Sequence, residues 1–209
     1  MWVIVPVKAF ENAKLRLAKI LNGAQRARLS ILMLEDTLET LSTSDVVQGM
    51  TVISSDQSVG PLALRYQAEF LPGDMDRGYS QDATRGISSV DQYGIATIAI
   101  IPADLPCLSH ADLSHLDLNH QGGMTLCPAV IDGGTNAVLF SPPLPMPLMF
   151  GIDSLNKYQN EAKQKNVAIK IERLEGLARD IDRPDDLLWL KQQLSGARAW
   201  SYIRQLKIE

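Results

Sequence analysis

Apolar residues along the chain follow two spacings, and each spacing predicts a different element of secondary structure. Short runs rich in β-branched and other apolar residues predict buried strands at 2–7, 49–54, 68–71, the first half of 97–108, 123–128, within 132–140, and at 167–171. Apolar residues at helical spacing predict helices at about 25–41, 59–67, 81–90, 111–116, 155–165, 184–194 and 197–206. Because strands and helices alternate, we expect an α/β domain with a mainly parallel sheet.

The stretch 97–108 predicts the centre of this sheet. Its first half reads Thr-Ile-Ala-Ile-Ile, as expected for a strand buried on both faces, and Pro-Ala-Asp-Leu-Pro follows. In open α/β sheets, ligands bind beyond the carboxyl ends of the strands. Asp104, held between Pro102 and Pro106, is therefore placed either to hold a metal ion or to cap the next helix or turn. The stretch alone does not separate these two interpretations.

Composition and charge exclude several classes of protein. The chain has 209 residues, a formal net charge of −4, two cysteines and no internal repeat or linker, so we expect one domain over residues 1–209. The acidic balance argues against a nucleic-acid partner, and two cysteines in this length argue against a disulfide framework. The start of the chain lacks the features of a signal peptide, and no segment resembles a membrane span. The cytoplasm is therefore the expected compartment.

Three cations follow the first predicted strand. Lys8, Lys14 and Arg16 lie in the segment 8–17, which contains no glycine. Cations placed directly after the first strand of an α/β sheet form a candidate clamp for phosphate groups. A solvent-exposed amphipathic connector has the same composition, and the segment by itself leaves both interpretations open.

A second group of acids lies near the carboxyl terminus. Asp180 and Asp182 alternate along the chain, so in extended structure both carboxylates project to one face. Like charges at this spacing repel, and a shared cation is the usual reason for keeping them together. For Asp182 there is an alternative: Pro184 in the first turn of the next helix would make it a suitable N-cap.

Loops rich in glycine and small polar residues flank several predicted strands. Glycines bracket the segment 73–80, which permits close approach of a ligand and equally suits a plain surface turn. The run Asp-Gly-Gly-Thr-Asn at 132–136 is typical of an anion-binding nest and also of a hairpin. In 150–154, Asp153 or Ser154 is a suitable N-cap for a helix whose N-terminus can receive a phosphate.

Several familiar catalytic patterns are missing from the sequence. It has no glycine motif for dinucleotides after the first strand, no P-loop and no Gly-x-Ser-x-Gly nucleophile elbow. The three histidines, His110, His115 and His120, are five residues apart and cannot share a helix face, so we expect them at the surface. For the two cysteines, Cys107 and Cys127, we expect positions on the core side. The remaining cations, carboxylates and glycine/hydroxyl loops suit Mg²⁺-dependent chemistry on phosphates.

Five motifs, in order along nearly the whole chain, together resemble one known family. They are Val-Pro-Val-Lys at 5–8 with Ala-Lys-Leu-Arg-Leu at 13–17, Pro-Ala-Asp-Leu-Pro at 102–106, Asp-Gly-Gly-Thr-Asn-Ala at 132–137, Phe-Gly-Ile-Asp-Ser at 150–154, and Asp-Ile-Asp-Arg-Pro-Asp-Asp-Leu at 180–187. With these motifs the chain resembles the 2-phospho-L-lactate guanylyltransferase family of deazaflavin coenzyme F(420) biosynthesis. That family is part of the molybdenum-cofactor-guanylyltransferase-like nucleotidyltransferases.

The resemblance implies a single Rossmann-like domain with three layers, α/β/α. It implies an enzyme that joins GTP to a small phosphorylated acid and releases pyrophosphate. Carried over by position, the implied Mg²⁺ ligands are Asp104, Asp180 and Asp182, and the implied catalytic set is Lys8, Lys14, Arg16 and Asp104. The three cations would embrace the triphosphate, and further nucleotide contacts fall to Ser54, Gly78 and Ser80. The implied contacts of the acid are Thr135, Gly151 and Ser154.

One loop departs from the family pattern. Where the family usually has Gly-Leu-Asn-Ala-Ala-Leu near the base, this chain has Gly-Tyr-Ser-Gln-Asp-Ala at 78–83. Serine in place of asparagine removes an amide, which bears on guanine preference.

The sequence does not choose among 2-phospho-L-lactate, phosphoenolpyruvate and 3-phospho-D-glycerate as the acid. It also leaves open a homodimer and the transfer of the product to the next enzyme of the pathway. One alternative is a related nucleotidyltransferase acting on a molybdopterin or sugar phosphate, although those relatives tend to have a glycine-rich first loop. The other is a non-catalytic nucleotide-binding regulator, against which the intact acids speak.

Overall fold

A seven-stranded sheet organises the described residues, which in this computed structural model are 1–74, 78–193 and 195–206. Its strands are β1 (Trp2–Pro6), β2 (Gly49–Ser54), β3 (Glu69–Pro72), β4 (Ile98–Ile100), β5 (Met124–Pro128), β6 (Thr135–Phe140) and β7 (Ile169–Ile171). They lie in the order β3-β2-β1-β4-β6-β5-β7. Within the described chain, β6 runs antiparallel to β4 and β5, and the other strand pairs are parallel. The expected mainly parallel sheet is thus confirmed.

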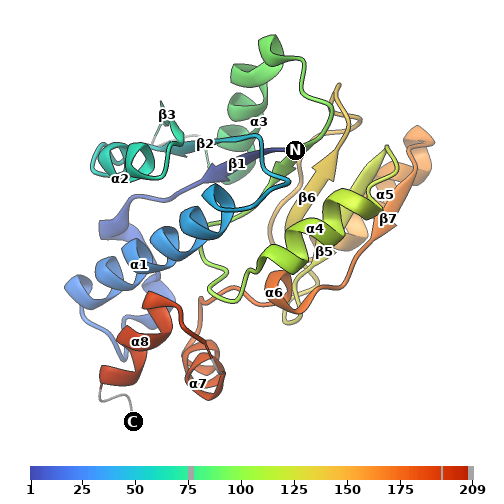
Figure 1. The fold of residues 1–209 in the computed structure, drawn as a ribbon. Coiled ribbons are helices and arrows are strands. Elements are labelled where there is room, and N and C mark those ends of the chain that lie inside the picture. Colours follow the sequence, from blue (N-terminus) through green and yellow to red (C-terminus); the bar gives the residue numbers. More distant parts are fainter. Residues whose placement is uncertain (75–77, 194, 207–209) are drawn as a thin grey trace.

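Helices cover both faces of the sheet (Figure 1). They are α1 (Gly23–Ser42), α2 (Val59–Arg65), α3 (Tyr79–Val90), α4 (His110–Asn119), α5 (Ser154–Lys165), α6 (Glu175–Ala178), α7 (Pro184–Gln192) and α8 (Arg198–Gln205). Side chains alternate along β1, so Val3 and Val5 pack with α1, α2, α4 and α6, whereas Ile4 packs with α3 and α5. The result is the three-layer α/β/α arrangement that the resemblance implies.

Several helices begin or end away from the predicted positions, for local reasons. Asn22 and Ser109 form capping boxes with the residues three positions later, so α1 and α4 begin slightly before the predicted starts. The helix predicted to reach Leu194 ends at Gln192, and Leu194 itself lies outside the described residues. The same holds for 75–77 within the glycine-bracketed loop. The short helix α6 was not predicted, because four residues are too few to show a helical spacing.

The histidines and cysteines only partly follow the sequence expectation. His110 is exposed, but His115 and His120 are half-buried and hydrogen-bond to Glu172 of the segment after β7 and to Thr125 of β5. Among the cysteines, Cys127 is buried and Cys107 is half-buried. None of the helices in the described ranges combines the length and the hydropathy that crossing a bilayer requires.

The order of the strands creates a crevice at one edge of the sheet. From β1 the chain proceeds outward to β2 and β3, and it then returns to β4 on the other side of β1. The connections that leave the carboxyl ends of β1 and β4 therefore diverge, which is the topological switch point where open α/β sheets bind ligands. The cation segment 8–17 follows β1, and Asp104 follows β4, so the fold brings both to this crevice.

The carboxyl-terminal helix α8 is attached to α1 by a buried carboxylate. Asp36 of α1 accepts hydrogen bonds from the backbone N–H groups of Arg198 and Ala199, each at 2.9 Å. These are two of the N–H groups that the first turn of α8 cannot satisfy internally. Asp36 also lies 3.2 Å from the guanidinium of Arg198, which Glu39 contacts from the solvent side.

We expect Asp36→Ala to lower the free energy of unfolding by about 2 kcal/mol, because it leaves buried N–H groups without an acceptor. Urea unfolding followed by circular dichroism measures this. Glu39→Ala is the matched control: its carboxylate contacts the same arginine but is about half exposed, and we expect a change below about 0.5 kcal/mol. Equal effects of the two substitutions would contradict the capping role of Asp36.

Candidate active site

Backbone hydrogen bonds bring the two groups of acids together. The N–H of Ile181 donates to the carbonyl of Asp104 at 3.1 Å, although the two residues are far apart in sequence. The Ile181 side chain is fully buried among residues of α1, α7 and α8. This anchor holds the flanking acids, Asp180 and Asp182, beside Asp104, and the extended Asp-Ile-Asp segment accounts for their shared orientation.

Lys14 lies at the centre of this group. It adopts a left-handed backbone conformation, with φ of 54°, between two short 3₁₀ turns, Phe10–Asn12 and Leu15–Leu17. Its side chain is only 9% exposed, and its ammonium lies 2.5 Å from Asp104 and 3.9 Å from Asp182. Burial alone would lower the pKa of Lys14, but Asp104 and the neighbouring acids outweigh this, so the pKa is raised. Lys14 therefore stays charged in the crevice.

Asp182 is engaged by the second cation of the segment. Its carboxylate lies 2.5 Å from the guanidinium of Arg16. The capping role considered for Asp182 belongs instead to Asp186, whose buried carboxylate accepts from the N–H groups of Asp182 and Arg183. Asp104 is likewise not a helix cap, since Ser109 caps α4. Both acids are thus free of the structural roles that competed with a ligand-binding role.

Among the three carboxylates, Asp180 lies in surroundings that disfavour its charged form. Burial and then the charge of Asp104 raise the pKa of Asp180 to about 6, while Lys14 acts in the opposite direction. A carboxylate held in a place that disfavours its charge is typical of functional sites, because a bound cation can offset the cost.

The three carboxylates fit a metal ion that arrives with a ligand. Within the described residues, no three His, Cys, Asp or Glu side chains are arranged as a ready-made metal site. Asp104, Asp180 and Asp182 nevertheless line the same cavity. Protein-bound Mg²⁺ usually takes one or two carboxylates and completes its shell with substrate phosphates and water. The donor set therefore suits Mg²⁺ bound together with phosphate groups, and the assignment of these ligands stays a prediction.

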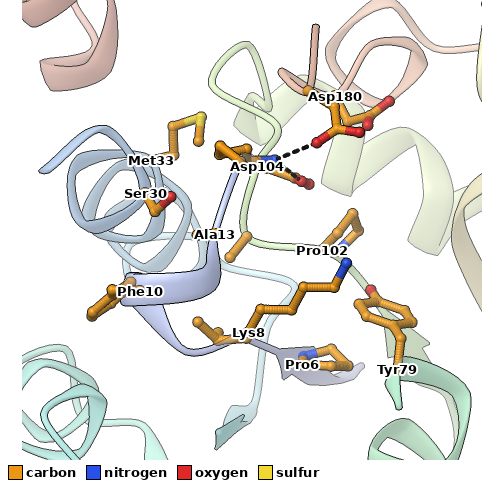
Figure 2. Close-up of a pocket in the computed structure, with 14 residues that line it drawn as sticks. Pro6, Lys8, Phe10, Ala13, Ser30, Met33, Tyr79, Pro102, Asp104 and Asp180 are labelled. Atoms are coloured by element: carbon orange, nitrogen blue, oxygen red, sulfur yellow. Dashed lines mark hydrogen bonds and ion pairs between the residues drawn. The ribbon is translucent and has the colours of Figure 1, made fainter. Parts of the chain in front are cut away.

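Three adjoining cavities surround Lys8 and Tyr79, and the three carboxylates line two of them, the central cavity and the β6 cavity. The central cavity contains the acids and Lys14, with Lys8 and Tyr79 on its wall. Figure 2 shows the Lys8 side chain reaching across this cavity toward Pro102 and Tyr79, with Asp104 and Asp180 on the far side. The β6 cavity, of about 400 Å³, extends toward the start of β6, and the α3 cavity extends toward the start of α3. Lys8 and Tyr79 line all three.

A buried hydroxyl makes the β6 cavity a candidate binding site. Thr135 and Gly151 line it together with Lys8 and Arg16. The Thr135 hydroxyl is buried and has no hydrogen-bond partner among the described residues, which costs free energy unless a ligand supplies one. The cavity thus offers cations and an unused hydroxyl to an anionic ligand of small size.

Ser154 occupies a different place from Thr135. It is fully buried at the start of α5, its hydroxyl is also without a partner in the described chain, and it does not line the three cavities. Asp153 takes the N-cap position but makes no capping hydrogen bond with its side chain. The start of α5 packs on the glycine turn: the N–H of Asp153 donates to the carbonyl of Asp132, and the N–H of Leu155 donates to the carbonyl of Gly133. Ser154 therefore supports the cavity wall, and direct contact with a ligand would require local movement.

The three implied nucleotide contacts do not lie together. Gly78 lines the α3 cavity. Ser80 lines the β6 cavity instead, and its hydroxyl accepts from the N–H of Phe150 at 3.4 Å. Ser54 is buried outside the three cavities and accepts from the N–H of Asp56, while its neighbour Ser55 lines the α3 cavity. Ser54 is the last residue of β2, and Ser55 begins the loop after it.

Sequence reasoning did not single out Tyr79 or the acids of the α3 cavity. Asp74 and Asp82 line this cavity with Gly78. Both acids lie in or beside the loop that departs from the family pattern, which was the available signal. A tyrosine in a polar glycine loop carries no spacing that distinguishes a ligand contact from packing.

Comparisons with known proteins agree on one family. The family model described as "Guanylyl transferase CofC like" matches residues 1–209. A protein of Roseiflexus castenholzii named phosphoenolpyruvate guanylyltransferase is 38% identical over 92% of this chain and 89% of its own length. A protein of Colwellia psychrerythraea named 3-phospho-D-glycerate guanylyltransferase is 29% identical over 88% of this chain and 89% of its own.

A solved structure shares the fold. A protein of Desulfovibrio desulfuricans G20, described as a "putative nucleotide-diphospho-sugar transferase", superposes with a TM-score of 0.80 over 98% of this chain and 94% of its own. At 16% sequence identity this similarity shows the fold alone.

Proposed function

The chain belongs to the family of CofC-like guanylyl transferases and is a nucleotidyl-transferring enzyme, and from this premise we propose that it couples GTP to phosphoenolpyruvate. The products would be a guanosine-diphosphate-linked acid and pyrophosphate. Phosphoenolpyruvate is preferred to 3-phospho-D-glycerate or 2-phospho-L-lactate because relatives at 37 to 38% identity are named for it. We further propose that the reaction is an early step of deazaflavin coenzyme F(420) biosynthesis, in the cytoplasm.

One observation supports this proposal above the others. Lys14 and Arg16 stand among three carboxylates at the switch point, next to a cavity that contains an unused hydroxyl. Such a site combines groups for a triphosphate, for a metal ion and for a small anion. We assign the nucleotide to the central and α3 cavities and the acid to the β6 cavity.

The α3 cavity suits guanine. Its wall carries the carboxylates of Asp74 and Asp82. Guanine presents an N1–H and a 2-amino group as donors on one edge, and a carboxylate accepts both, whereas adenine presents an unprotonated N1 there. The departure of this loop from the usual family sequence is therefore compatible with guanine preference.

In the proposed reaction the phosphate of the acid attacks the α-phosphorus of GTP. One P–O bond forms, and the P–O bond to pyrophosphate breaks. The attacking phosphate is already anionic, so the step needs no general base, and the barrier is mainly electrostatic. Lys8, Lys14 and Arg16 would neutralise the triphosphate and hold it in place. Mg²⁺, held by Asp104, Asp180 and Asp182, would supply further positive charge when bound.

Pyrophosphate release tests the proposal directly. We expect Mg²⁺-dependent release from GTP with phosphoenolpyruvate, and weaker release with the other two phosphoacids; ATP and CTP serve as controls. Binding of GTP without turnover of any acid would favour a non-catalytic regulator. Turnover only with a molybdopterin or a sugar phosphate would favour the alternative nucleotidyltransferase. Size-exclusion chromatography with light scattering decides between a monomer and the homodimer that the sequence leaves open. Transfer of the product to the next enzyme of the pathway stays a prediction.

Thr135→Val tests the assignment of the acid to the β6 cavity. Valine has nearly the same shape but no hydroxyl, so we expect the KM for the acid to rise about tenfold while the KM for GTP changes little. Stability should not fall, because the lost hydroxyl has no partner in the described chain. The control is Thr125→Val on β5, whose hydroxyl pairs with His120 at 2.9 Å. There we expect lower stability and unchanged kinetics; the opposite pattern would remove Thr135 from the acid site.

A further inference from the structure

Tyr79 stands where the three cavities meet. It is the first residue of α3, and its ring packs edge-to-face on Phe150, with ring centroids 4.8 Å apart. It lines the central, β6 and α3 cavities, which makes it a neighbour of the proposed nucleotide and acid sites at once. Figure 2 shows its hydroxyl pointing into the central cavity, toward the end of the Lys8 side chain.

The hydroxyl of Tyr79 is enclosed and has no hydrogen-bond partner among the described residues. Tyrosines that bury this group nearly always pair it, since an unpaired buried hydroxyl costs about 1 to 3 kcal/mol. Its proton is secure, because burial and then the charge of Asp104 raise the pKa of Tyr79 well above its ordinary value. The site thus contains a neutral O–H donor that has no acceptor among the described residues, which lowers the free energy of unfolding.

A phosphate oxygen is the acceptor that fits this donor. Lys8 lies beside the same cavities, its residue is exposed, and it has no ion-pair partner within the described ranges. An ammonium beside an O–H donor forms a pair that favours an anion, and the nearby Asp104 disfavours a ligand that brings no cation. Because the Lys8 side chain is long and flexible, it can turn onto a bound phosphate and uncover the hydroxyl.

We propose that the Tyr79 hydroxyl donates a hydrogen bond to a phosphate oxygen at the junction of the three cavities, where the guanylyl group is transferred. The inference rests on the proposed function, and it assigns Tyr79 to the reacting phosphates rather than to the base or the carboxylate of the acid. Negative charge builds up on the departing pyrophosphate during transfer, so a hydrogen bond to one of its oxygens strengthens as the transition state forms.

Tyr79→Phe isolates this hydroxyl, because the ring and its contact with Phe150 remain. We expect kcat/KM to fall about 10- to 100-fold, mostly in kcat, with the melting temperature unchanged or higher. A merely structural tyrosine would give the same stability result with unchanged kinetics. Tyr93→Phe is the matched control: that hydroxyl donates to Glu69 at 2.9 Å, away from the three cavities, and its loss should leave kcat/KM unchanged.

Binding measurements separate this inference from the proposed function. Calorimetry gives the Kd of GTP and of pyrophosphate, each with Mg²⁺, for the wild type and for Tyr79→Phe. If the wild type turns over no phosphoacid, the proposed function is wrong, and the binding data then decide: weaker binding to the variant supports the phosphate contact. Equal kcat/KM, or equal Kd values where turnover is absent, overturns it.

Discussion

Asp104→Asn is expected to reduce kcat by about 10²- to 10³-fold while the protein remains folded. Asp104 pairs with Lys14 at 2.5 Å and lies beside Asp180, so its charge organises the cation and carboxylate groups that the proposed reaction needs. Asparagine retains the shape and removes the charge. Pyrophosphate release under saturating GTP and acid measures the loss. Asp45→Asn, which changes an exposed acid outside the cavities, is the control and should retain full activity.

A double variant separates the catalytic loss from a loss of stability. Asp104→Asn leaves the nearly buried ammonium of Lys14 without its main partner, so we expect it to lower stability by about 2 kcal/mol. Adding Lys14→Met removes the unpaired charge and should restore most of that stability, but not activity. Recovery of activity in the double variant would show that Asp104 acts only by holding Lys14.

Two of the proposed metal ligands are paired with cations of the segment 8–17. Among the described residues, Asp104 has one close cation, Lys14, and the same carboxylate is a proposed Mg²⁺ ligand. A lysine side chain can leave a carboxylate for a phosphate, because an ammonium is a compact charge on a flexible stem. Arg16 stands in the same relation to Asp182. When GTP binds, Lys14 and Arg16 would pair with its phosphates, and Asp104 and Asp182 would hold Mg²⁺, whose positive charge would replace that of the two cations.

The sequence predicts much of this site because local pattern and topology agree. A buried strand followed by a carboxylate, as at Asp104, predicts a ligand group at the sheet edge, and a cation segment after the first strand predicts its counter-charge. The alternation of Asp180 and Asp182 gives their common face. The sequence pattern does not show which charged groups pair with each other. Lys14 rather than Lys8 pairs with Asp104, and this depends on the left-handed backbone conformation at residue 14.

The remaining differences have similar physical causes. The reversal of β6 follows from the short turn at 132–134, and a run of apolar residues carries no direction. Ser54 and Ser55 carry the same side chain, and only the backbone at the end of β2 decides that Ser55 lines the α3 cavity while Ser54 accepts from the N–H of Asp56. Capping of α7 by Asp186 instead of Asp182 is a difference of one turn, which sequence signals do not resolve.

Asp180→Asn is expected to stabilise the ligand-free protein and to impair the enzyme. The pKa of Asp180 in the folded chain is about 6, above the ordinary value of an aspartate, so folding favours its protonated form. The cost of ionising it is absent below about pH 4 and fully present above about pH 6. Asparagine removes that cost, and at pH 8 we expect a gain of about 2 kcal/mol, or about 5 °C in melting temperature.

At pH 4 the same substitution should leave stability nearly unchanged, and this pH dependence is the signature of the buried charge. Activity should fall by about 100-fold at pH 8, since the proposed metal site loses a ligand. Asp182→Asn is the matched control: its carboxylate is paired with Arg16, so no gain in stability is expected at any pH. Melting curves at both pH values and pyrophosphate release at pH 8 measure these effects. A variant that is fully active, or less stable at pH 8, would show that Asp180 serves the fold and not the ligand.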